Sequence, residues 1–112
     1  MKKTLLLALV IAGTSVISVA TVTAGDVKEN WEKLCAKCHG PDGKGETKMG
    51  QKLEIKDLTN AKLQAELKDE QAFKAIKEGI KDKEGKIKMK PAEGVTDDEI
   101  KALVSHVRTL KK

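Results

Sequence analysis

Two cysteines and a histidine stand together in the segment Cys35-Ala36-Lys37-Cys38-His39. Cysteines at this spacing lie about one helical turn apart on one helix face, so both thiols can reach the two vinyl groups of one haem. The histidine that follows then lies beneath the iron and can serve as its proximal ligand. A Cys-x-x-Cys-His run is typical of covalent haem attachment. The segment therefore predicts one haem c, with its iron, as the cofactor.

Other uses of these residues fit the sequence less well. A thioredoxin-like Cys-x-x-Cys belongs near a βαβ pattern, and no strand-rich segment is evident. A structural zinc site needs four ligands, and beyond this segment His106 is the only other cysteine or histidine. A disulfide between Cys35 and Cys38 would leave His39 without a role.

The start of the chain has the pattern of an export signal. A basic pair, Lys2 and Lys3, precedes an apolar stretch, and Val22-Thr23-Ala24 offers a small-residue cleavage site. We expect residues 1–24 to be a cleaved signal peptide, residues 25–112 to form one domain, and the mature protein to be periplasmic. Cleavage after Ala20 is the second option. Retention of the segment as a membrane anchor is the alternative, which the small and polar residues inside the stretch disfavour.

The bulk composition favours a fold built around a cofactor. Removing residues 1–24 leaves 88 residues, and the net charge falls from +5 to +3 because the removed part holds two lysines and no acids. This mild basic excess, without interleaved aromatic residues, gives no indication of nucleic-acid binding. The chain has one Trp, one Phe and no Tyr, so its core is modest. A covalently attached haem would staple such a small scaffold.

Apolar periodicity and capping residues predict helices separated by loops in the mature chain. Glycines in the stretch Gly40–Gly45 break the first helix. The expected helices are Asp26 to about Cys38, a short one near Ala61–Glu66, Asp69 to Gly79, and a last helix capped by Thr96; Met49–Asn60 is expected to be irregular and Lys81–Lys90 a lysine-rich loop.

The chain resembles a class I cytochrome c of the small bacterial monohaem type over nearly all of residues 26–110. Three blocks carry the resemblance: Trp31-x-x-x-Cys35-x-x-Cys38-His39-Gly40-x-x-Gly43-x-Gly45, then Ile76-x-x-Gly79 followed by Met89-Lys90-Pro91, then the final helix from Asp97 to Leu110. The resemblance implies an all-α class I cytochrome c fold. In that fold roughly three to four short helices wrap around one covalently attached haem.

The resemblance also assigns roles to single residues. Cys35 and Cys38 would form the haem thioethers, and His39 and Met89 would be the axial iron ligands. Trp31 would pack against the last helix and the haem edge. Met49 is the competing thioether, although packing beside the haem suits it better.

Three departures from the family pattern bear on the site. His106 stands where relatives often carry an aromatic residue on the last helix, and we expect a helix contact rather than a second haem ligand. Lys90 separates Met89 from Pro91, which are adjacent in many relatives. The stretch 50–53 has no proline, so we expect a non-proline carbonyl there to accept the N–H of His39.

The family implies a one-electron carrier between membrane respiratory complexes and redox partners, and not an enzyme. Partners would be a membrane oxidase, a bc-type complex or a soluble reductase, met by a monomer without a permanent membrane anchor. They would dock at a haem edge bordered by the lysines Lys44, Lys48, Lys52, Lys81, Lys83, Lys86, Lys88 and Lys90. The alternative is a haem enzyme or gas-binding sensor with an open sixth coordination site.

The attachment motif and the export signal together predict the mass of the mature protein. Protein matured in its native host should show the mass of residues 25–112 plus one haem, because both thiols of the motif become thioethers. Intact-mass spectrometry makes the measurement. The mass of the bare polypeptide would contradict covalent attachment.

Overall fold

The computed structural model describes residues 11–15 and 23–112, so most of the expected signal peptide lies outside the described residues. Within these ranges the chain is mainly helical, as the sequence predicted, and none of the described helices is long and apolar enough to cross a membrane. The elements in chain order are α1 (Ala24–Leu34), α2 (Ala36–His39), α3 (Lys48–Lys52), α4 (Ala61–Glu66), α5 (Asp69–Glu78), β1 (Ile80–Lys81), β2 (Ile87–Met89) and α6 (Asp97–Thr109).

The first predicted helix is present but is divided and begins earlier. Thr23 is the N-cap, and its side chain accepts a hydrogen bond from the Asp26 amide at 3.3 Å. Asp26 therefore lies in the first turn, where its negative charge interacts favourably with the helix dipole and stabilises the helix. Cys35 separates α1 from α2, although its amide still donates to the Trp31 carbonyl at 2.9 Å.

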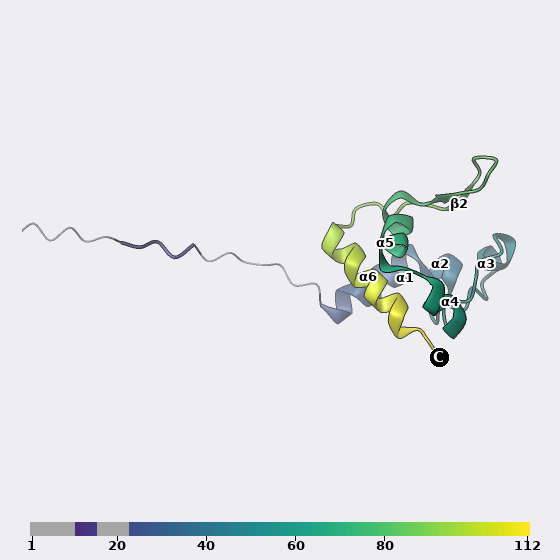
Figure 1. The fold of residues 1–112 in the computed structure, drawn as a ribbon, viewed down its shortest axis with the longest axis horizontal. Coiled ribbons are helices and arrows are strands. Elements are labelled where there is room, and N and C mark those ends of the chain that lie inside the picture. Colours follow the sequence, from purple (N-terminus) through teal and green to yellow (C-terminus); the bar gives the residue numbers. More distant parts are fainter. Residues whose placement is uncertain (1–10, 16–22) are drawn as a thin grey trace, which may run out of the picture.

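The last helix forms as predicted and organises the core. Thr96 and Glu99 make the reciprocal hydrogen bonds of a capping box at its start. Its apolar stripe faces α1 and α5, which cross it (Figure 1). The residues buried along this contact are Trp31, Cys35, Ala72, Ile76, Ile100, Leu103, Val104 and Val107.

The middle of the chain holds more regular structure than the sequence predicted. The short helix α4 and the start of α5 at Asp69 and its end at Gly79 agree with expectation, and Lys68 is the N-cap of α5. Helix α3 overlaps the start of the stretch expected to be irregular, and Thr47 caps it. The predicted lysine-rich loop contains an antiparallel hairpin formed by β1 and β2, visible at the upper right of Figure 1.

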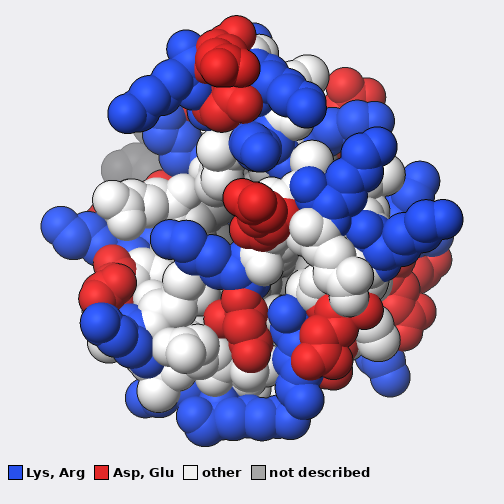
Figure 2. Space-filling model, turned by 90° about the vertical axis from the view of Figure 1, so that its right-hand side faces the viewer, with Lys and Arg blue, Asp and Glu red and all other residues white. Residues whose placement is uncertain are grey.

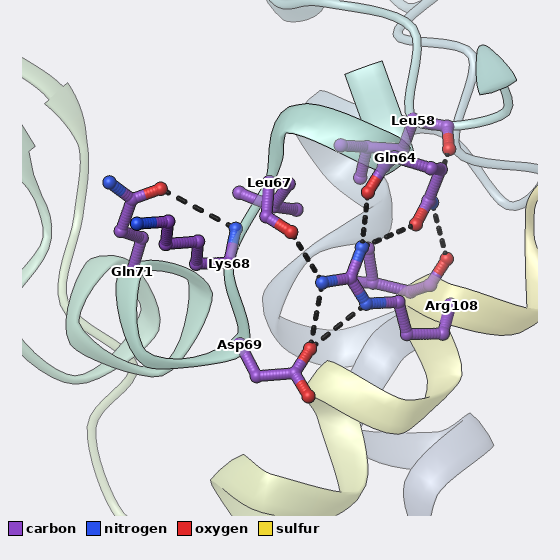
Figure 3. A network of polar contacts seen from close by, with 8 residues as sticks. Leu58, Gln64, Leu67, Lys68, Asp69, Gln71 and Arg108 are labelled. Carbon is purple, nitrogen blue, oxygen red and sulfur yellow. Dashed lines mark hydrogen bonds and ion pairs between the residues drawn. The ribbon is translucent and has the colours of Figure 1, made fainter. Parts of the chain in front are cut away.

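Two side chains join α4 and α5 to the end of α6 (Figure 3). Gln64 is buried, and its Nε2 donates to the carbonyls of Leu58 at 2.7 Å and Val107 at 2.8 Å. The Arg108 guanidinium donates to Asp69 Oδ1 at 2.9 Å and to the Gln64 carbonyl at 2.7 Å, and also to the Leu67 carbonyl. A helix as short as α4 is marginal alone, so these bonds hold it in place.

We expect Gln64→Leu to destabilise the haem-loaded protein by about 1–3 kcal/mol, because buried carbonyls lose their donor. Chemical denaturation measures the free energy of unfolding. Gln51→Leu is the matched control, since Gln51 is exposed and makes none of these bonds, and it should change stability by less than about 0.5 kcal/mol. Equal effects of the two substitutions would contradict the role of Gln64.

Candidate functional site

The structure brings the motif residues together where α1 ends and α2 begins. Cys35 is the residue between the two helices and is 7% exposed, within the core. Cys38 and His39 lie on α2 and are half-buried. Neither cysteine forms a disulfide. The disulfide interpretation of the motif therefore finds no support, and both thiols remain available for haem.

Burial raises the pKa of the Cys35 thiol to about 11, and the neighbouring Cys38 adds to this effect through charge repulsion. The thiol therefore stays protonated at neutral pH and is a weak nucleophile toward disulfides. A buried, protonated thiol is therefore unsuited to thiol–disulfide exchange, and this agrees with a residue that is used for haem attachment.

His39 has a ring nitrogen that the polypeptide does not satisfy. Its Nδ1 is buried and has no hydrogen-bond partner among the described residues. The expected acceptor, a carbonyl within the stretch 50–53, is therefore wrong for this structure. Burial also lowers the pKa of His39, which favours the neutral imidazole that binds metals. Two free thiols followed by such a ring are the donor set that a covalently held haem requires, so the site fits this cofactor.

Backbone contacts fix the segment that carries these side chains. The Thr47 hydroxyl donates to the Cys38 carbonyl at 2.7 Å and accepts from the Gly50 amide at 2.8 Å. A Cβ added at Gly50 would meet the carbonyls of Gly45 and Cys38. Helix α3 can therefore approach α2 this closely only with glycine at position 50.

Trp31 contacts both histidines of the chain. It is 3% exposed, and its ring centroid lies 5.9 Å from that of His39 and 5.0 Å from that of His106. Its Nε1 donates to the Gly40 carbonyl at 3.2 Å. Trp31 thus packs against the last helix, as the resemblance implied for this position, and it also supports the loop that follows His39.

His106 makes the helix contact expected of it. It is half-buried on α6 against Trp31, and its Nε2 is buried without a hydrogen-bond partner among the described residues. Burial lowers the pKa of His106 and so favours the neutral ring. A neutral ring packs against the indole of Trp31 without burying a charge.

The two candidate methionines differ in their surroundings. Met89 ends β2, is half-buried, and packs against the core cluster. Met49 lies on α3 with 36% of its surface exposed, and it is not among the residues packed against that cluster. Met89 is therefore the methionine that belongs to the packed interior, whereas Met49 lies at the surface.

The hairpin presents a basic surface that also contains apolar side chains. Its lysines at 81, 83, 86 and 90 are exposed, and Lys88 is half-buried. Figure 2 views the side of the molecule where the hairpin and α3 lie, and lysine and arginine side chains border much of a hollowed, mostly uncharged centre, with acidic groups among them. Ile80 and Ile87 were not predicted to be part of this surface, and they are 46% and 49% exposed on the hairpin. For Ile87, the signal in the sequence was the alternation of isoleucine or methionine with lysine along β2.

Comparisons with known proteins show what the whole chain is similar to. The family model for cytochrome c matches residues 24–111. Among solved structures, the chain is similar to the KustC0563 c-type cytochrome, with 36% identity and a TM-score of 0.65 over 76% of this chain and 96% of that chain. A point mutant of that protein is also similar, with 36% identity, a TM-score of 0.64, and coverage of 77% and 99%. The search of curated proteins found no match.

Proposed function

Because the chain belongs to the cytochrome c family, we propose that it is an exported carrier of single electrons between redox proteins. Family membership also establishes the cofactor, a covalently bound haem c with its iron. The observation that carries the proposal is the motif segment, where two free thiols are followed directly by a half-buried histidine.

Four side chains would hold the cofactor. Cys35 and Cys38 would form the two thioethers, while His39 and Met89 would be the axial ligands. The bound haem supplies an iron that alternates between the ferric and ferrous states by taking up or losing one electron. His and Met ligation raises the reduction potential of such a haem. With His39 and Met89 both bound to the iron, no substrate would reach it, which favours a carrier over an enzyme or a gas sensor.

The expected export signal bears on how α1 begins in the mature protein. Cleavage after Ala24 would remove Thr23, which is the N-cap of α1. Asp26 could then take over the capping role, since aspartate is a preferred N-cap residue. Cleavage after Ala20 would retain Thr23. A periplasmic protein processed at either position would keep all four proposed haem-binding residues.

The hairpin surface supports encounter with acidic redox proteins by a monomeric carrier. A membrane oxidase, a bc-type complex or a soluble reductase would meet the lysines around the haem edge. Basic rims steer such encounters and raise association rates more than they raise affinity. The exposed isoleucines Ile80 and Ile87 would add apolar contact once the proteins touch.

We expect Met89→Ala to open the sixth coordination position and to lower the reduction potential, because an axial thioether raises it. The variant should bind carbon monoxide in the ferrous state, which optical spectroscopy detects, and voltammetry measures its potential. Met49→Ala is the matched control and should behave like the original protein. Carbon monoxide binding by Met49→Ala alone would show that Met49 is the ligand, and binding by the original protein would favour the sensor or enzyme.

We expect electron transfer to a native partner to slow as salt rises, because charges are screened over ~8–10 Å near physiological ionic strength. Lys86→Glu and Lys88→Glu should each slow the reaction at low salt, as stopped-flow measurements would reveal. Lys101→Glu, the same charge change on α6, is the control and should have a smaller effect. A rate that is flat with salt and unaffected at positions 86 and 88 would exclude the hairpin as the docking face.

A further inference from the structure

The end of α5 touches the backbone on both sides of Lys90. Gly79 ends this helix with a φ of 77°. A Cβ added there would lie 2.5 Å from the Met89 carbonyl oxygen and 2.9 Å from both the nitrogen and the Cδ of Pro91. These distances are too short for real atoms, so Met89 and Pro91 rest on Gly79 only because it has no side chain.

Further contacts tie the same chain segment to α5. The Ala92 amide donates to the Ile76 carbonyl at 2.8 Å, and Ile76 is buried in the core. On the other side, Met89 pairs with Ile80 in the hairpin. The chain is therefore fixed before and after Lys90, and Lys90 itself is exposed. This geometry accommodates the lysine that separates Met89 from Pro91.

We propose that Gly79 is a positioning residue for Met89, and that its missing side chain sets how closely the methionine can approach the iron. The inference rests on the proposed assignment of Met89 as axial ligand. Gly79 lies at the end of a helix anchored in the core, so a shift of the Met89 backbone away from it would change the distance between the Met89 sulfur and the iron and weaken their bond. Side chains in such packed contacts cannot be enlarged without displacement.

Two other glycines with a similar backbone conformation show that the effect of a Cβ at Gly79 is more than backbone strain. Gly85 and Gly94 have φ values of 80° and 74°, close to that of Gly79, but an added Cβ at either would meet nothing within 4 Å. Alanine at any of the three positions is strained by the positive φ. Only alanine at Gly79 would also push against Met89 and Pro91.

The test compares Gly79→Ala with Gly85→Ala in the haem-loaded protein. The readouts are the methionine–iron charge-transfer band of the ferric form and the affinity for added imidazole, which competes with the methionine. We expect Gly79→Ala to weaken the band and to raise imidazole affinity by about tenfold, because a larger fraction of molecules has an open site. Gly85→Ala should change neither readout, even if both variants lose similar stability in chemical denaturation.

Equal band intensity and equal imidazole affinity in the two variants would overturn the inference. If Gly79→Ala yields no haem-loaded protein, Pro91→Ala is tested in its place. This change removes the proline ring that rests on Gly79 and lifts the restriction that the ring places on the backbone of Lys90. Imidazole affinity should then rise several-fold, and an unchanged value would overturn the inference. The assignment of Met89 as axial ligand fails if the original protein lacks the charge-transfer band and Met89→Ala binds imidazole no more tightly than the original protein. The inference about Gly79 then fails as well.

Discussion

The packing of Trp31 is the contact on which the rest of the structure depends. Its indole lies where α1 crosses α6, against His106, and reaches His39 on α2. Its Nε1 also holds the carbonyl of Gly40, directly after the proposed iron ligand. One side chain therefore joins the first helix, the last helix and the haem-attachment segment. Because interiors are close-packed, a substitution at the helix crossing would be expected to shift His39 as well.

The core around this contact is small, and the proposed haem-binding residues belong to it. Among the described residues, only Ile100 and Leu103 are large side chains with less than 2% of their surface exposed. Cys35 is itself one of the buried core residues, and Met89 packs against the same cluster from the other half of the chain. A haem linked to Cys35 and bound by Met89 would extend this core and close it covalently, which a small scaffold needs.

The sequence predicted those parts of the structure that depend only on residues close together in the chain. The attachment motif is contiguous, the capping box at Thr96 spans one helical turn, and a glycine is the common residue where a helix such as α5 ends. The hairpin was missed because β1 and β2 have two and three residues and gain stability only from pairing with each other. The absence of an acceptor for His39 Nδ1, likewise, depends on where α3 lies and not on the residue types in it.

The same limit applies to Gly79, whose motif position was visible but whose contacts with Met89 and Pro91 were not. Those contacts clarify how one short segment can serve two purposes. The hairpin exposes lysines and isoleucines that a partner would touch, and its second strand ends at the proposed iron ligand. If Met89 were held by β2 alone, movement of the hairpin when a partner docks would alter the bond between Met89 and the iron. Met89 and Pro91 instead rest on the end of α5, and the Ile76 carbonyl fixes the next residue, so the core rather than the exposed hairpin determines the position of the methionine.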